Sequence, residues 1–129
     1  MGRPAILCVD DEAIILMALK QELRRVYADR FIYESALNAE DALAAIDEMA
    51  GEGISVILVI SDWLMPGMRG DEFLLRVNQR HPEVRCIVVT GHADQEALDN
   101  LRSVLGDVPV IGKPWRKNEL YAAVDSLVM

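Results

Sequence analysis

Residues 55–70 read SVILVISDWLMPGMRG, and this stretch decides the fold. Its first half is an almost continuous apolar run that stops at Asp62, and its second half contains the Pro66-Gly67 pair, which is typical of a turn. A short run that is apolar at successive positions suits a parallel strand covered on both faces. The stretch therefore predicts a buried strand over residues 55–61, followed directly by a carboxylate.

Short apolar runs alternate with longer amphipathic segments along the rest of the chain. Ile15, Leu16, Leu19 and Leu23, for example, lie along one stripe of a predicted helix, as packing on a sheet requires. The pattern predicts strands over residues 5–9, 31–35, 55–61, 85–90 and 108–111, and helices over residues 12–26, 39–49, 71–79, 94–105 and 118–128. This alternation predicts an α/β fold with a five-stranded, doubly wound parallel sheet in a single domain over residues 1–129.

The composition suits a globular protein and weighs against several functions. The 129 residues are 52% hydrophobic and 26% charged, which is enough for a packed core. The net charge of −8 argues against direct nucleic-acid binding, which needs clustered Lys and Arg. The longest apolar run, residues 54–60, is far shorter than the ~20 residues that span a bilayer. We therefore expect no membrane insertion and a cytoplasmic location. Cys8 and Cys86 lie in separate apolar runs and are expected to be core residues.

Polar side chains follow four of the five predicted strands. They are Asp10, Asp11 and Glu12 after the first strand, Ser61 and Asp62 at the third, Thr90 at the fourth and Lys113 after the fifth. Open parallel sheets bind ligands in the crevice outside the carboxyl ends of their strands. If the second strand lies at an outer position, the other four ends converge on one pocket.

The acidic groups of this pocket predict a bound cation. Three carboxylates held together repel one another, and a hard divalent ion offsets their charge. Magnesium prefers oxygen ligands, whereas no His or Cys adjoins the cluster to favour zinc. An aspartate can also act as a nucleophile toward a phosphoryl group, and Asp62 is the candidate. Lys113 and Thr90 would then neutralise or hydrogen-bond the phosphoryl oxygens.

Each of these residues taken alone also has an ordinary structural explanation. Acidic residues favour a helix N-terminus, which fits Asp10 to Glu12, and hydroxyls such as Thr90 often cap helices. Lys113 could be a solvated lysine, and Asp62 could belong to the turn that follows it. Only the joint placement of these groups at four strand ends favours a phosphoryl-transfer site.

Four motifs resemble those of response-regulator receiver domains, which accept phosphoryl groups in two-component signalling. They are VDDE at residues 9–12, SDWLMPGMRG at 61–70, VTG at 89–91 and KPW at 113–115. The resemblance covers almost the whole chain and implies the flavodoxin-like receiver fold. It also implies that Asp62 accepts the phosphoryl group from a histidine kinase or a histidine phosphotransfer protein.

The resemblance further implies a role for each site residue. Asp11 and Asp62 would bind Mg²⁺ directly, Asp10 would assist through water, and the backbone carbonyl of Leu64 would supply another ligand. Thr90 and Lys113 would take the family's hydroxyl and ammonium roles, with a cis peptide bond between Lys113 and Pro114. The protein would not be an enzyme beyond its own phosphorylation and slow autodephosphorylation. The predicted fourth helix, fifth strand and fifth helix would control an unknown downstream protein. The kinase, the target and the oligomeric state stay open.

One position departs from the family pattern. Many relatives carry Tyr or Phe three residues before the lysine, whereas this chain has Val110. The stretch of residues 106–108 also differs from the usual pattern, so we expect a local difference between the fourth helix and the fifth strand. A switch that depends on an aromatic ring is in doubt here.

Three other functions fit less well. A phosphatase of the haloacid dehalogenase type needs a second Asp two residues after its nucleophile, where this chain has Leu64. A flavodoxin-like cofactor carrier needs a phosphate-cradling loop after the first strand, and the acidic residues 10–12 would repel an anion. A receiver that serves only for docking ranks third, because every expected acceptor residue is present.

Overall fold

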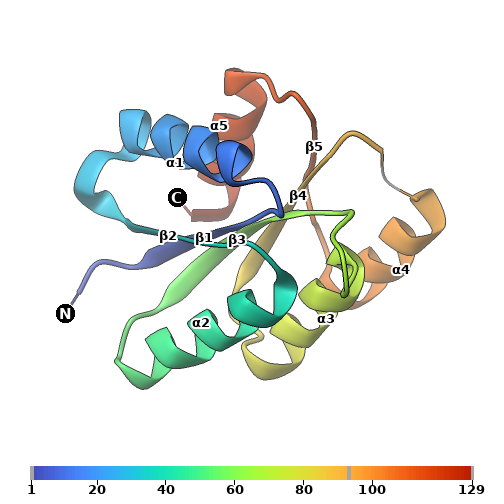
Figure 1. Ribbon diagram of the computed structural model, residues 1–129, viewed down its shortest axis with the longest axis horizontal. Coiled ribbons are helices and arrows are strands. Elements are labelled where there is room, and N and C mark those ends of the chain that lie inside the picture. The colour runs from blue at the N-terminus through green and yellow to red at the C-terminus, as the bar shows by residue number, and fades with distance from the viewer. Residues whose placement is uncertain (1, 93, 129) are drawn as a thin grey trace.

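The architecture is one parallel sheet with helices on both faces (Figure 1). The computed structural model describes residues 2–92 and 94–128. The strands are β1 (Ala5–Val9), β2 (Ile32–Ala36), β3 (Val56–Asp62), β4 (Arg85–Thr90) and β5 (Val110–Gly112). The helices are α1 (Ala13–Tyr27), α2 (Ala39–Gly51), α3 (Gly70–Arg80), α4 (Gln95–Leu105) and α5 (Lys117–Val128), with a short 3-10 turn, η1 (Ala28–Arg30). The α/β fold with a five-stranded parallel sheet is confirmed.

The strand order is β2-β1-β3-β4-β5, so β2 lies at an edge, as the convergent pocket requires. All pairings are parallel. The carboxyl ends of β1, β3, β4 and β5 therefore lie side by side at one end of the sheet. The direction in which successive strands are added to the sheet changes between β1 and β3. Ligands bind at such a point in sheets of this type.

Alternate residues of the central strands pack into two separate cores. Leu7 and Val59 face the core under α2, α3 and α4, whereas Ile6 and Ile60 face the core under α1 and α5. This arrangement explains why the strand sequences are apolar at almost every position. The two cysteines are buried in opposite cores, and burial raises the pKa of each thiol to about 12. They are core residues, as expected.

The fifth strand is shorter than the sequence predicts. It begins at Val110 rather than at residue 108, because Pro109 has no N–H to donate to the ladder. The Pro109 carbonyl still accepts a hydrogen bond from the Val88 amide at 3.0 Å. The preceding carbonyl, of Val108, instead accepts from the Arg102 side chain at 2.8 Å from Nη2. Strand β2 is also displaced by one residue, to Ile32–Ala36. Within the described ranges, none of the helices combines the length and the apolar character needed to cross a bilayer.

Helix α3 starts in close contact with the backbone of Asp62. The Gly70 amide donates to the Trp63 carbonyl at 2.9 Å, which holds the start of α3 against the end of β3. A Cβ atom built on Gly70 would lie 2.5 Å from the Asp62 carbonyl oxygen and 2.9 Å from the Trp63 Cα. Both are backbone atoms and cannot rotate away, so this position requires glycine.

We therefore expect Gly70→Ala to destabilise the fold by about 1 to 3 kcal/mol, because the added methyl group displaces the backbone of Asp62. Gly51→Ala is the matched control. Gly51 is the last residue of α2, and its Cβ would meet no atom within 4 Å. The control should be neutral or stabilising by up to about 1 kcal/mol. Urea unfolding of both variants measures the difference, and equal stabilities would show that the contact at Gly70 is unimportant.

Candidate functional site

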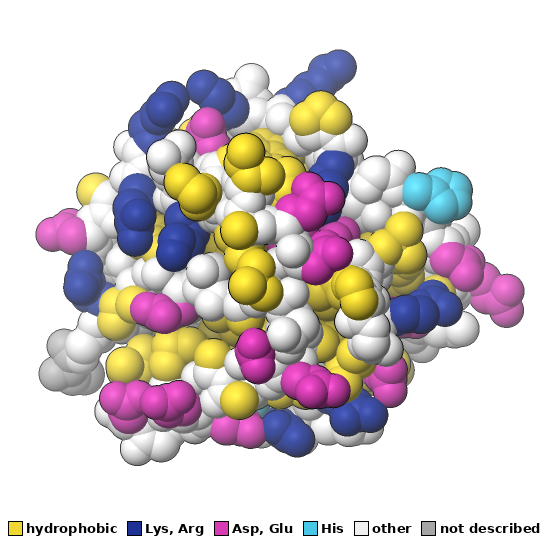
Figure 2. Space-filling model, in the orientation of Figure 1, with side chains coloured by type: hydrophobic (Ala, Val, Ile, Leu, Met, Phe, Trp, Pro, Cys, Tyr) yellow, Lys and Arg dark blue, Asp and Glu magenta, His cyan; other side chains and the backbone are white. Residues whose placement is uncertain are grey.

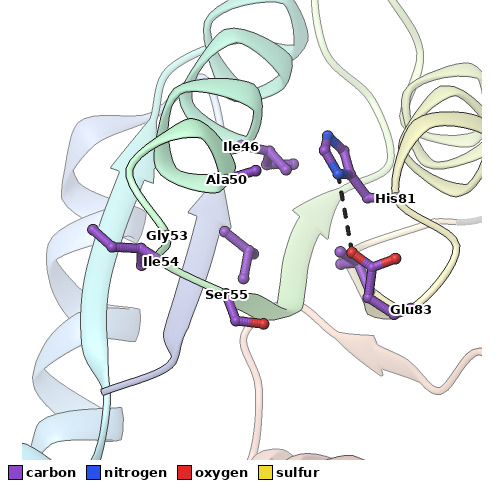
Figure 3. Close-up of a pocket in the computed structure, with 9 residues that line it drawn as sticks. Ile46, Ala50, Gly53, Ile54, Ser55, His81 and Glu83 are labelled. Carbon is purple, nitrogen blue, oxygen red and sulfur yellow. Dashed lines mark ion pairs between the residues drawn. The ribbon is translucent and has the colours of Figure 1, made fainter. Parts of the chain in front are cut away.

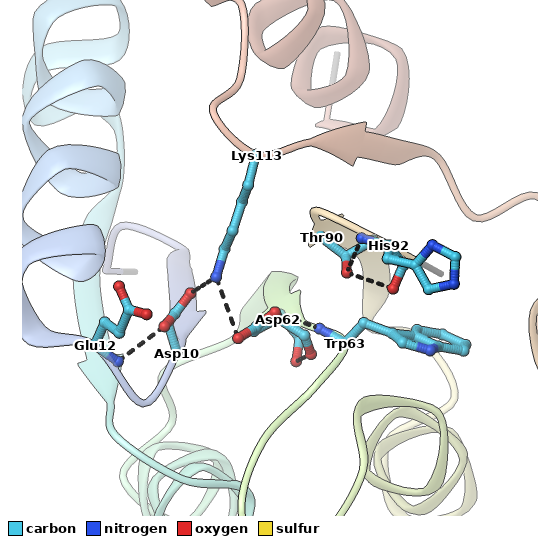
Figure 4. A network of polar contacts seen from close by, with 8 residues as sticks. Asp10, Glu12, Asp62, Trp63, Thr90, His92 and Lys113 are labelled. Carbon is cyan, nitrogen blue, oxygen red and sulfur yellow. Dashed lines mark hydrogen bonds and ion pairs between the residues drawn. The ribbon is translucent and has the colours of Figure 1, made fainter. Parts of the chain in front are cut away.

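Asp10 directly follows β1 and is held on both sides. Its side chain is almost completely buried, with 1% of the residue exposed. One carboxylate oxygen, Oδ1, accepts a hydrogen bond from the Glu12 amide at 2.8 Å. The other, Oδ2, lies 2.7 Å from the Lys113 Nζ (Figure 4). Both oxygens of Asp10 are thus already partnered by the protein.

Asp62 is the last residue of β3 and is also buried. Its Oδ1 accepts from the Trp63 amide at 2.8 Å, and its Oδ2 lies 3.2 Å from the Lys113 Nζ. Burial raises the pKa of Asp62, and the nearby charge of Asp10 raises it further. The hydrogen bond and the positive charge of Lys113 act in the opposite direction without cancelling the increase. The ionised form of Asp62 is therefore less stable here than it would be in water.

Lys113 connects the two carboxylates. Its backbone amide donates to the Thr90 carbonyl at 3.1 Å, which fixes the residue just beyond the end of β5. The side chain then reaches the ends of β1 and β3, as Figure 4 shows. Burial lowers the pKa of Lys113, but hydrogen bonds to Asp10 and Asp62 raise it above its ordinary value. The peptide bond to Pro114 is cis, as the resemblance implies.

Asp11 completes the cluster of three carboxylates. One oxygen from each of Asp10, Asp11 and Asp62 lies within 4.8 Å of the others, and Asp11 is exposed. This set of oxygen donors around a concentrated negative charge fits a hard divalent cation such as Mg²⁺. Leu64 lies two residues after Asp62 with 60% of its surface exposed. Its carbonyl accepts no hydrogen bond from residues 2–92 and 94–128, so the oxygen has no protein partner there.

Thr90 ends β4 beside the site, as the sequence predicts, and its hydroxyl takes part in the turn that follows. The Thr90 Oγ1 donates to the His92 carbonyl at 3.0 Å and accepts from the His92 amide at 3.1 Å. In the described parts of the chain, no hydrogen bond joins Thr90 to Asp62. The structure therefore brings Asp10, Asp11, Asp62 and Lys113 together and leaves the Thr90 hydroxyl bonded to the loop.

Several groups that shape the site escaped the sequence analysis. The amides of Glu12 and Trp63 hold the two buried carboxylates, and the His92 backbone holds Thr90. Such groups carry no sequence signal, because nearly every residue has a backbone amide. Ser61, at the same strand end, turns out to be buried, and its hydroxyl donates to the Asp62 carbonyl at 2.9 Å.

Comparison with known proteins identifies the family. A family model of the response regulator receiver domain matches residues 6–125. The chain belongs to the response regulator receiver family. It is 33% identical over 123 residues to the hydrogenase transcriptional regulatory protein HoxA of Cupriavidus necator, which covers 95% of this chain and 24% of HoxA. It is 28% identical over 129 residues to the sensor kinase CckA of Brucella abortus, which covers 98% of this chain and 13% of CckA.

The receiver fold also appears in solved structures. The signal receiver domain of an HD domain-containing protein from Pseudomonas fluorescens Pf-5 matches with a TM-score of 0.81 and 29% identity. The match covers 99% of this chain and 88% of that one. The receiver chain described here spans about a quarter or less of the two curated relatives named above.

A separate hollow of about 270 Å³ lies outside the carboxylate cluster, between α2 and the loop after α3 (Figure 3). His81 lines it, and its Nε2 lies 2.7 Å from Asp47 Oδ1, while its Nδ1 lies 4.0 Å from Glu83 Oε1. Arg80 also pairs with Asp47, at 2.7 Å. These contacts join α2 to the end of α3. The hydrogen bond from His81 holds the pKa of Asp47 below its usual value. These charged side chains pair with one another, and we assign this hollow no function.

The raised pKa of Asp62 predicts how stability depends on pH. Because the folded pKa exceeds the unfolded value, the folded state binds the proton more tightly, and ionised Asp62 destabilises the fold. This destabilisation is absent when the pH lies below the pKa of Asp62 in the unfolded chain, about 3.9, and is complete when the pH lies above its pKa in the folded protein. In a buffer with chelator, Asp62→Asn should therefore melt at a higher temperature than the wild type at neutral pH.

The gap between the two melting curves should narrow as the pH falls toward about 4, where Asp62 of the wild type becomes protonated. Asp11→Asn, which removes an exposed carboxylate from the same cluster, serves as the control and should have a smaller effect. An Asp62→Asn variant that melts below the wild type at neutral pH would contradict the assignment of an electrostatic cost to this residue.

Proposed function

We propose that the chain is a phosphoacceptor switch in a cytoplasmic two-component phosphorelay, with Asp62 as the acceptor. The donor would be the phosphohistidine of a histidine kinase or a histidine phosphotransfer protein. The observation that supports this most strongly is the pairing of buried Asp10 and Asp62 with the single ammonium of Lys113 beside the exposed carboxylate of Asp11. Such a cluster combines a nucleophile with groups that offset the charge of a phosphoryl group.

The transfer uses chemistry that the named side chains can supply. A carboxylate oxygen of Asp62 attacks the phosphorus, the bond from phosphorus to the donor nitrogen breaks, and its electron pair stays on the imidazole. The product is an acyl phosphate on Asp62. The Lys113 ammonium, already 3.2 Å from Asp62 Oδ2, would pair with a phosphoryl oxygen. Such transfer depends mainly on positioning and on neutralising the phosphoryl oxygens.

Asp11 and Asp62 are the residues proposed to hold Mg²⁺ directly, together with the Leu64 carbonyl. Asp10 would act through water, because the Glu12 amide and Lys113 already occupy its two oxygens. When bound, Mg²⁺ would neutralise the negative charge of the carboxylates and of the incoming phosphoryl group.

The chain would catalyse no reaction other than its own phosphorylation and the slow hydrolysis of the acyl phosphate on Asp62. Leu64 follows the acceptor by two residues in the chain, and its side chain is exposed and apolar. A leucine cannot orient an attacking water by hydrogen bonding. The protein would therefore act as a switch with a persistent phosphorylated state rather than as a phosphatase.

The signal would leave the site through Thr90. Its hydroxyl bonds the His92 backbone, and a phosphoryl group on Asp62 would compete for it. A hydroxyl drawn to the phosphoryl group would release the loop before α4 and bias the face of α4, β5 and α5 that controls a partner. Val110 has no ring to move inward, and 36% of its surface is exposed. The loop backbone would carry the change in place of an aromatic side chain.

The proposal predicts that acetyl phosphate adds one phosphoryl group to the protein only when a divalent cation is present. Intact-mass spectrometry measures the adduct directly. Asp62→Asn should remove it completely, and Asp11→Ala should reduce it at a given Mg²⁺ concentration more than Asp10→Ala does, because Asp10 would bind through water. An adduct that persists in Asp62→Asn, or that forms equally in excess chelator, would overturn the site assignment.

The same sample tests the route of the signal. With beryllofluoride as the phosphoryl mimic, changes in amide hydrogen exchange should concentrate between Gly91 and Ile111. Thr90→Ala should still bind the mimic but lose most of these changes, because the hydroxyl that exchanges partners is gone. An intact response in Thr90→Ala, or changes confined to the surroundings of Asp62, would show that another element reads the phosphoryl group.

A further inference from the structure

Basic side chains gather beside the edge strand β2, although the chain as a whole carries a net charge of −8. Figure 2 shows Lys and Arg side chains grouped on the side of the molecule where α1 ends and β2 begins. Four basic residues contact β2 or the residues just before it, and we call them the edge cluster: Arg3, Lys20, Arg24 and Arg30. Two carboxylates, Asp29 and Glu34, lie among them. The cluster is a local positive region on an acidic protein.

The contacts of the edge cluster hold its charges around the start of β2. The Arg24 guanidinium lies over the Tyr33 ring at 5.5 Å from its centroid, and the Arg30 guanidinium lies at the same distance over Phe31. The Arg3 Nη1 donates to the Asp29 carbonyl at 3.2 Å. The contacts of Arg3 and Arg24 orient these two guanidinium groups without neutralising them, because aromatic rings and carbonyl oxygens carry no formal charge.

A hollow of about 470 Å³ opens at this edge. Arg3 and Arg24 line it together with Asp29 and the consecutive residues 31–34, the last three of which belong to β2. The hollow therefore lies along the first residues of β2, beside the end of α1 and η1. An extended chain has the shape that fits such a site.

The backbone of β2 also presents unused hydrogen-bonding groups at this edge. β2 pairs with β1 on one side, and no described strand covers its other side. The Ile32 amide donates inward, to the Pro4 carbonyl at 2.9 Å. Because successive residues of a strand direct their amides and carbonyls to opposite sides, those of Tyr33 and Ser35 face outward. An outward row of this kind can pair with an added strand.

We propose that the outer edge of β2 binds an extended acidic segment of a partner protein as an added strand, with its carboxylates on Arg3, Arg24 and Lys20. The added strand would use the free backbone groups, and the edge cluster would select acidic side chains. A nucleic acid fits less well, since it has no use for the strand's backbone groups and the acidic remainder of the surface would repel a long polyanion. The site is independent of phosphorylation at Asp62, because β1 separates β2 from β3.

Charged side chains at an edge strand have a second effect, which is to prevent pairing with other copies of the chain, and basic residues beside β2 could act in this way. The two roles differ in what they predict. A purely protective cluster has no affinity for acidic peptides beyond general charge attraction. A docking site binds them saturably and requires the peptide's backbone amides.

Fluorescence anisotropy with a labelled short peptide that alternates glutamate and valine tests the proposal. The wild type should bind it saturably, and affinity should fall as salt is added. The double variant Arg3→Gln with Arg24→Gln should bind at least about tenfold more weakly, whereas Arg76→Gln should bind like the wild type. Arg76 is exposed on α3 and pairs with Glu72, so it controls for a charge change elsewhere.

The backbone part of the proposal is tested separately. The same peptide with methylated backbone nitrogens keeps its charge but cannot pair as a strand, and it should not bind. In the protein, Ser35→Pro removes an outward amide while leaving the ladder to β1 intact, and it should also weaken binding. Thermal unfolding of each variant checks that the fold is retained. Equal binding of the methylated peptide, equal binding of a lysine and valine peptide, tighter binding of short duplex DNA, or no saturable binding would each overturn the proposal.

Discussion

The ammonium of Lys113 lies between two buried carboxylates, 2.7 Å from Asp10 and 3.2 Å from Asp62. Asp10 follows the end of β1 and Asp62 ends β3, and these two strands are adjacent in the sheet. Because both carboxylates are buried and close together, their ionised forms are destabilised by desolvation and by mutual repulsion. One positive charge offsets part of this destabilisation, and Asp11 adds a further negative charge at the solvent-exposed rim. The site therefore has an excess of negative charge that an additional cation would relieve.

The same arrangement explains why a phosphoryl group on Asp62 would change the protein beyond the site. The groups that would contact it are already engaged: Lys113 with two carboxylates, and Thr90 with the His92 backbone. Rearranging Thr90 affects the loop that leads to α4. The start of α3 is less able to respond, because Gly70 lies against the Asp62 backbone with no room for a side chain. The close contact at Gly70 and the exchangeable hydrogen bond of Thr90 would together direct the change toward α4 rather than α3.

The sequence predicts most of the fold and the placement of the acidic groups. Continuous apolar runs are reliable signals for buried parallel strands, and a polar residue directly after such a run falls at the end of the sheet where ligands bind. This reasoning places Asp10, Asp62 and Lys113 together, as the structure does. It fails where local chemistry decides, as at β5, where Pro109 delays the start of the strand. The bonds of the Thr90 hydroxyl to the His92 backbone also have no sequence signature, because nearly every residue has a backbone amide and carbonyl. The edge cluster has no sequence signal either, because Arg3 is distant in sequence from Lys20 and Arg24 on α1 and the three come together only around β2.

The central claim is that the carboxylates of Asp10, Asp11 and Asp62 form a site for a divalent cation. Its most direct test is the melting temperature of the protein as magnesium chloride is added at constant ionic strength. The wild type should become more stable with increasing Mg²⁺, as binding to the folded state requires. Asp11→Asn should respond far less, whereas Asp107→Asn, an exposed change between α4 and β5, should respond like the wild type. An equal increase in the wild type and in Asp11→Asn, or no increase in the wild type, would contradict the claim.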